Sequence, residues 1–165
     1  MNRKILRQMI SQVLEPHRFC SAKDMYYRRD GEVFLVLALD RPSFGGPFFI
    51  ELGLFVDETG QLAHPPPVYL CHIRQQLTVI MPKKERISLI EALDLERAMP
   101  QADRSTIIRH SIESYALPFL EALNTVDKIV TLLNEGDPRV IPGTMILHDL
   151  LFKRMGWKPP TRPSR

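Results

Sequence analysis

The sequence predicts an α+β fold: an antiparallel sheet of about four strands, with one N-terminal helix before it and long C-terminal helices packed on one face. Apolar residues recur with helical spacing over residues 3–14, with the shorter period of strands over residues 25–80, and with helical spacing again over residues 88–133. Turn residues separate consecutive strand segments, which is typical of antiparallel neighbours. With 165 residues, the chain is expected to form one domain over residues 1–155, followed by a flexible basic, proline-rich tail at 156–165.

The first helix and the first hairpin follow from apolar spacing and from turn residues. Residues 3–14 direct one apolar face toward the core, and that face consists of Ile5, Leu6, Met9, Ile10, Val13 and Leu14. Pro16 ends this helix because proline interrupts the helical hydrogen bonding. A strand over residues 23–29 then ends at Asp30-Gly31, which favours a tight hairpin because glycine tolerates the positive φ of such turns.

Three further strands complete the predicted sheet. Residues 32–40 are apolar on both faces, so this strand is expected to be central and covered on both sides. Residues 48–56 alternate, and their apolar face consists of Phe48, Ile50, Leu52, Leu54 and Val56. Three prolines at residues 65–67 predict a stretch of polyproline II at the surface, and a fourth strand is expected over residues 70–80.

Helical spacing then returns for the rest of the chain. Ser88 and Glu91 have the spacing of a capping box, which predicts a helix start at Ser88. A longer apolar stripe over residues 108–133 runs straight through Pro118, and it predicts either one kinked helix or two nearly coaxial ones. A short helix is expected over residues 144–155.

Charge and cysteine content narrow the classes of function. The net charge of +3 is small, and Lys and Arg are spread along the chain, so nucleic-acid binding through the basic termini ranks only third among the functions considered. The longest apolar run, residues 33–39, is far too short to cross a bilayer that requires about 20 residues. Two cysteines, Cys20 and Cys71, give no disulfide framework, and together these features predict a cytoplasmic protein.

Several short motifs occur in a defined order. They are Phe19 after the first helix, the Tyr-Tyr-Arg of residues 26–28, the Ile-Glu-Leu-Gly-Leu-Phe of residues 50–55, the Cys-His-Ile-Arg of residues 71–74 and the Tyr-Ala-Leu-Pro-Phe-Leu of residues 115–120. In this order the chain resembles the bacterial domain-of-unknown-function family 4304 over roughly residues 1–135. The resemblance implies the α+β fold, and it implies neither a catalytic residue nor a cofactor. The chain departs from the family's pattern at Glu51, where members favour asparagine.

One group of polar residues is the candidate site. Glu51, His72, Arg74 and Gln76 are expected on one polar sheet face if the third and fourth strands pair in suitable register, and Arg28 is a further candidate. A carboxylate, an imidazole and a guanidinium together could bind a ligand or transfer a proton. The competing interpretation is a solvated sheet face, which requires the same alternation of polar residues.

A metal or thiol site is weighed and set aside. His17, Cys20, Cys71 and His72 are ligand types for zinc, but Cys71 and His72 are adjacent on a predicted strand and therefore point to opposite faces. Cys71 is expected on the apolar side with Ile73, where a buried thiol is inert. We therefore expect no metal, no cofactor and no catalytic residue.

The sequence thus favours a non-enzymatic module that binds another protein through its exposed sheet face or its proline loop. The alternative is a small-molecule-binding protein or enzyme acting through Glu51, His72 and Arg74. No membrane partner is expected.

Overall fold

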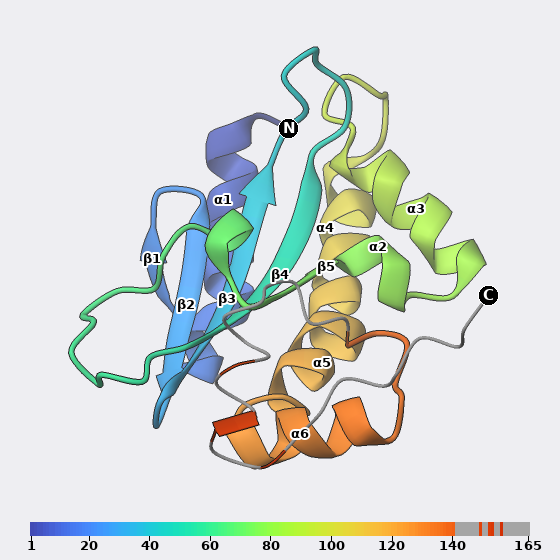
Figure 1. Ribbon diagram of the computed structural model, residues 1–165. Helices are drawn as coiled ribbons and strands as arrows, with labels where there is room; N and C mark the ends of the chain where they lie inside the picture. The colour runs from blue at the N-terminus through green and yellow to red at the C-terminus, as the bar shows by residue number, and fades with distance from the viewer. Residues whose placement is uncertain (141–148, 150–151, 154–155, 157–165) are drawn as a thin grey trace.

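The fold is α+β, as predicted, and the sheet has five antiparallel strands in the order β1-β2-β3-β4-β5 (Figure 1). The computed structural model describes residues 1–140, 149, 152–153 and 156. The strands are β1 (Cys20–Ala22), β2 (Met25–Asp30), β3 (Val33–Asp40), β4 (Phe49–Val56) and β5 (Ile73–Gln76). Each strand pairs with its neighbour in the chain, so the sheet is a simple meander. The short strand β1 is the one that the sequence pattern did not predict.

Helices before and after the sheet complete the described part of the fold. They are α1 (Arg3–Leu14), the 3₁₀ turns η1 (Glu15–His17) and η2 (Val68–Leu70), α2 (Leu77–Ile80), α3 (Lys83–Leu93), α4 (Gln101–Ser111), the π-helical turn η3 (Ile112–Ala116), α5 (Leu117–Glu121) and α6 (Val126–Asn134). The predicted first helix is confirmed with its apolar face, since its buried residues are Leu6, Met9, Ile10, Val13 and Leu14. The side-chain oxygen of Asn2 caps this helix by accepting the N–H of Ile5.

One face of the sheet is covered by helices, and we call it the helix-covered face. Figure 1 shows α1 and the column formed by α4 and α5 on the same side of the sheet. Buried strand residues of this face include Tyr26, Val33, Leu35, Leu37, Leu39, Ile50, Leu52, Leu54, Val56 and Ile73. They form one core with the apolar residues of α1 and of α3 to α6, which is the arrangement predicted for the C-terminal helices.

The opposite face is covered by the segment between β4 and β5, and we call it the loop-covered face. A second, smaller cluster of buried residues lies there, formed by Phe34, Val36, Ala38, Val68 and Cys71. β3 therefore contributes to both clusters, and residues 33–39 are all buried. The prediction of a central strand covered on both sides is confirmed.

The predicted fourth strand is wrong in extent. Only Ile73–Gln76 is a strand, because the chain turns into α2 at Leu77. Leu77 and Met81 are both buried in the helix-covered core, and a spacing of four places side chains on one side of a helical turn. Leu77 is buried as part of a helical turn, so the apolar alternation of the sequence runs past the end of the strand at Gln76.

The predicted helix start at Ser88 is also wrong. α3 begins at Lys83 after Pro82, whose extended backbone precedes the first turn. Ser88 lies inside the helix, where its hydroxyl donates to the carbonyl of Lys84 over 3.4 Å. A Ser and a Glu three residues apart also occur within helices, so this spacing alone did not locate the first residue of the helix.

Pro118 does not break the helix, because the chain continues from α4 through η3 into α5. Proline has no N–H to donate, and the helix widens just before it, so that the N–H of Leu117 bonds to the carbonyl of Ile112. The break occurs after α5, where Thr125 caps the start of α6 by accepting the N–H of Lys128. The apolar stripe, predicted as one kinked helix or two nearly coaxial ones, therefore divides between this widened column and α6.

Two predictions fall largely outside the described residues. These are the short helix over residues 144–155 and the basic tail at 156–165. Within the described residues, no helix has the length and apolar character needed to span a bilayer.

Candidate functional site

Three of the predicted site residues lie together on the loop-covered face. The β4–β5 register places Glu51 opposite Gln76 and Gly53 opposite Arg74. A nitrogen (Nη2) of Arg74 lies 2.8 Å from Oε1 of Glu51, so the two side chains form an ion pair. The Glu51 side chain is largely buried, whereas 43% of the Arg74 side chain is exposed. Glu51, the only carboxylate of this group, is therefore paired and largely buried, and the pair exposes mainly the guanidinium of Arg74.

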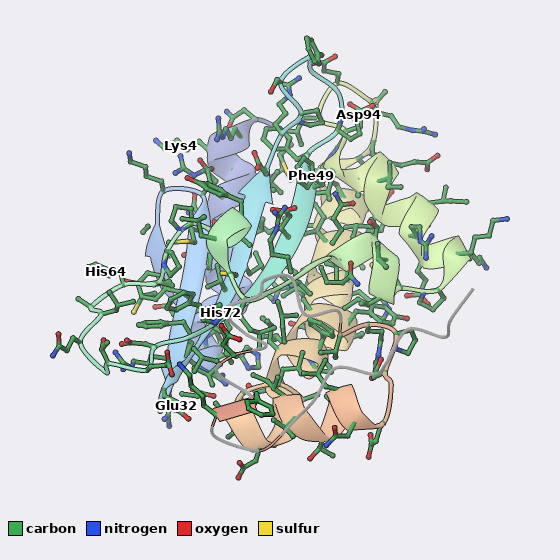
Figure 2. All side chains as sticks on the ribbon, in the orientation of Figure 1. Lys4, Glu32, Phe49, His64, His72 and Asp94 are labelled. Atoms are coloured by element: carbon green, nitrogen blue, oxygen red, sulfur yellow. The ribbon has the colours of Figure 1, made fainter. Side chains whose placement is uncertain are left out.

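His72 lies at the end of this face and has a structural role. β5 pairs with β4 only as far as Ile73 opposite Leu54, so the ladder leaves the N–H of Val56 without a strand partner. Nδ1 of His72 accepts that N–H over 3.0 Å, and the imidazole stacks on Phe55 with ring centroids 4.4 Å apart. Burial lowers the pKa of His72 below its usual 6.5, so the ring is neutral and carries its proton on Nε2. Figure 2 shows His72 beside the sheet, whereas His64 lies on the outlying loop.

Cys71 does not lie with Ile73 on the helix-covered face, and that prediction is wrong. The chain is not a strand at this point, because Cys71 follows the η2 turn with φ −64° and ψ 148°. The thiol therefore packs into the loop-covered cluster, directly over Gly53. Burial raises the pKa of the Cys71 thiol to about 12, which keeps it protonated and inert at neutral pH.

The four zinc-type ligands considered in the sequence do not form one site. Cys20 is exposed on β1, whereas Cys71 and His72 are buried on the loop-covered face. Within the described residues, no cluster of three or more His, Cys, Asp or Glu side chains is suited to a metal ion.

Arg28 lies on the helix-covered side of the sheet, away from the Glu51–Arg74 pair. Its guanidinium pairs with Asp30 at 2.6 Å and with Glu121 of α5 at 2.7 Å. It also donates to the carbonyl of His17 and lies over the ring of Phe19. These contacts tie β2 to η1 and α5, so Arg28 joins elements of the fold and does not belong to the predicted polar face.

The segment between β4 and β5 forms a second candidate surface, which we call the proline segment (residues 57–71). Its start is fixed by Asp57, a buried carboxylate that accepts hydrogen bonds from Thr59 and from the N–H of Leu62. Arg29 adds an ion pair to Asp57 and donates to the carbonyl of Leu62. Burial acts to raise the pKa of Asp57, but the hydrogen bonds from Thr59 and Leu62 and the charge of Arg29 outweigh it and hold this pKa below its usual value.

The rest of the proline segment is buried where it contacts the sheet and exposed on its outer side. Pro65 and Val68 are buried, and Val68 belongs to the loop-covered cluster with Cys71. The predicted surface run of prolines is therefore partly a core element. Leu62, Tyr69 and Leu70 are exposed by 40%, 63% and 54%, respectively. A fixed backbone thus presents three large apolar side chains to solvent.

Sequence reasoning missed Asp57 and Arg29, which hold this surface in place. The signal was present, because Asp57 and Thr59 are turn-forming residues placed directly after a strand. Their meaning depends on Arg29 from another strand, which the linear pattern does not reveal. None of the four hollows described within residues 1–140 is lined by Glu51, His72 or Arg74.

The fold and these surfaces define an α+β module in which Glu51, His72, Arg74 and Arg28 are engaged in structural contacts, while Tyr69 and Leu70 are exposed to solvent. A family model described as "Domain of unknown function (DUF4304)" matches residues 10–122. The chain belongs to this family, which confirms the resemblance noted from its motifs. No curated protein and no solved structure matches the chain.

Proposed function

We propose that this protein is a non-enzymatic protein-binding module and that the proline segment docks the partner. The observation that carries the proposal is the exposure of the adjacent residues Tyr69 and Leu70 on a segment that is anchored at both ends. Exposed apolar side chains that form a group favour an interaction surface, whereas single ones are ordinary.

The rigidity of the segment supports this function. A preordered loop loses little conformational freedom on binding, so more of the contact energy appears as affinity. Tyrosine is enriched among the residues that dominate protein interfaces, because its ring buries a large area and its hydroxyl can still hydrogen-bond. Here Tyr69 lies in the η2 turn, next to Val68, which is buried in the loop-covered cluster.

The state of the polar face favours this function over the enzymatic alternative. Glu51 is bound to Arg74, and His72 is neutral, buried and bonded to the backbone through Nδ1. A general base needs an accessible lone pair within reach of a substrate proton, but the acceptor nitrogen of His72 is already used and the Glu51 carboxylate is largely buried beside Arg74.

The test begins with an affinity capture from the native lysate after nuclease treatment, with proteins identified by mass spectrometry. The recovered partner is then purified, and its dissociation constant is measured against the wild type and the double variant Tyr69→Ala/Leu70→Ala. We expect this variant to bind about tenfold more weakly or worse. The matched control is Ile87→Ala/Ile90→Ala, which removes two exposed apolar side chains from α3 instead.

Equal affinity of both double variants would place the interface elsewhere. Self-association that disappears with Tyr69→Ala/Leu70→Ala would show that the surface joins two copies of this chain, and it would contradict a separate partner. A screen of metabolites by thermal shift tests the small-molecule alternative. If no protein is recovered and a metabolite raises the melting temperature of the wild type but not of Arg74→Ala, the proposal is wrong.

A further inference from the structure

We propose that the unpaired end of β2 binds an extended acidic peptide of another protein by strand addition, in the groove beside Arg29. Leu62 of the proline segment lines this groove, but Tyr69 and Leu70 do not, and the inference does not depend on the proposed function.

The sheet edge is incomplete at this place. β1 pairs with residues 25–27 of β2 and ends there, with Cys20 opposite Tyr27. Residues 28–30 of β2 continue along β3 to the hairpin turn, and no β1 residue stands opposite them. One half of β2 is therefore an internal strand and the other half is an edge.

The phase of the ladder shows which backbone groups this edge presents. The N–H of Leu39 donates to the carbonyl of Asp24 over 2.8 Å, so Asp24 bonds toward β3. Antiparallel strands bond to alternate sides at successive residues, so the even-numbered residues of β2 bond to β3 and the odd-numbered residues point outward. Tyr27 uses its outward groups on β1, and Arg29 directs its N–H and its carbonyl to the position that β1 leaves empty.

The chain before β1 is turned away from this position by its own backbone. Arg18 has the left-handed φ of 63°, and the N–H of Phe19 donates back to the carbonyl of Leu14 over 3.4 Å. The chain thus returns toward the end of α1 instead of extending β1 along β2. The position opposite Arg29 remains open for a segment from outside.

A groove lies at this position and has room for such a segment. Its volume is about 730 Å³, within the range of about 300–1,000 Å³ typical of ligand sites. Tyr27, Phe34, Leu62 and Pro16 contribute aromatic and apolar surface to its lining. Residues 28–30 offer about 10 Å of edge, since each strand residue advances by about 3.3 Å. Apolar side chains on the added strand would find contacts there.

The charges of the groove favour an acidic occupant. Its two acids, Asp30 and Glu121, are both held by Arg28, at 2.6 and 2.7 Å. Arg29 is paired with a buried carboxylate. Arg18 lines the groove, and among the described residues no ion pair involves it. A carboxylate on the peptide would gain an ion pair with Arg18, whereas a basic peptide would meet like charge.

The first experiment is a selection of short random peptides displayed on phage against the full chain. We expect enriched sequences to contain at least one acid, to favour β-branched and aromatic residues, and to lack proline at their centre. Enriched peptides are synthesised, and their dissociation constants are measured by fluorescence polarisation. Chemical-shift changes in the amide spectrum should centre on Tyr27, Arg29 and Arg18.

A pair of variants isolates the backbone contact. Arg29→Pro removes an N–H that points away from β3, so the β2–β3 ladder keeps its hydrogen bonds, and proline is tolerated on edge strands. Arg29→Ala loses the same side chain but keeps the N–H, and it is the matched control. We expect Arg29→Pro to bind about tenfold more weakly than Arg29→Ala. Arg18→Asn removes the charge while tolerating the left-handed φ, and it should weaken acidic peptides selectively.

Circular dichroism and the amide spectrum check that each variant is folded, and Arg18→Asn keeps the test informative if Arg29→Pro does not fold. Equal binding by wild type and Arg18→Asn, or by Arg29→Ala and Arg29→Pro, overturns strand addition of an acidic peptide. A selection without enrichment overturns it as well. If the selected peptides fail to bind Tyr69→Ala/Leu70→Ala but still bind the Arg18 and Arg29 variants, the groove is not their binding site and the proposed docking surface is supported.

Discussion

Gly53 sets the distance between the sheet and the proline segment, and substituting it provides a quantitative test of the fold. A Cβ atom on Gly53 would lie 2.8 Å from Sγ of Cys71 and 2.9 Å from Cγ2 of Val68. Carbon atoms in contact prefer about 3.5–4.0 Å, so both side chains would have to retreat by roughly 0.5–1 Å. Overpacking of this kind costs about 1–3 kcal/mol.

An opposing term reduces the net effect of Gly53→Ala. Alanine restricts the unfolded chain more than glycine does, which stabilises the folded state by about 0.4–1 kcal/mol where the backbone is compatible. Gly53 has an ordinary strand conformation without positive φ, so this gain applies. We expect a net loss of about 1–2 kcal/mol in the free energy of unfolding.

The assay is urea unfolding followed by circular dichroism, in a double-mutant cycle. Val68→Ala/Cys71→Ala removes the two atoms nearest to the added Cβ, so adding Gly53→Ala to that variant should cost less than adding it to the wild type. If Gly53→Ala is equally harmful in both backgrounds, the close approach is not the cause. A wild-type-like stability of the single variant would refute the packing described for the loop-covered face.

Three further predictions concern buried polar groups. Arg104→Leu removes the buried donor to carbonyls at the end of α3 and in the turn after it, so we expect the free energy of unfolding, measured in urea, to fall by about 3 kcal/mol. The control is Arg109→Leu at an exposed position, which should stay within about 0.5 kcal/mol of wild type. Since burial holds the pKa of His72 below 6.5, its contribution to stability is complete above that pH and is lost as the pH falls, so wild type should lose more stability than His72→Asn between about pH 7 and pH 5. A thiol reagent at pH 8 should label Cys20 at once and Cys71 only at the rate of unfolding; rapid labelling of both would contradict the burial of Cys71.

The sequence correctly predicted the elements that depend only on residues close to one another in the chain. The buried face of α1 and the hairpin at Asp30-Gly31 are of this kind, because local spacing and one turn determine them. Alternation along β4 and β5 also placed Glu51, Arg74 and Gln76 on one face, whereas the register that brings Glu51 to Arg74 is known only from the structure.

The errors share a different origin, in contacts made by parts of the chain that are distant in sequence. Cys71 appeared to lie on a strand, but η2 turns the chain over Gly53 and carries the thiol to the other face. Arg28 appeared to be a ligand group, but its guanidinium binds Glu121 in α5. Neither partner is visible in a local pattern, since each depends on tertiary packing.

The strictly sequential meander has a consequence for how the chain folds as it is synthesised. Every strand pairs with its neighbour in the chain, so a nascent chain that has emerged as far as Gln76 already holds the complete sheet, and such local pairing favours rapid formation. At that stage α1 is the only long helix available to cover the helix-covered face, because α3 to α6 are not yet made. A large apolar surface is therefore exposed until translation reaches the α4–α5 column, and we expect this protein to engage chaperones during that interval.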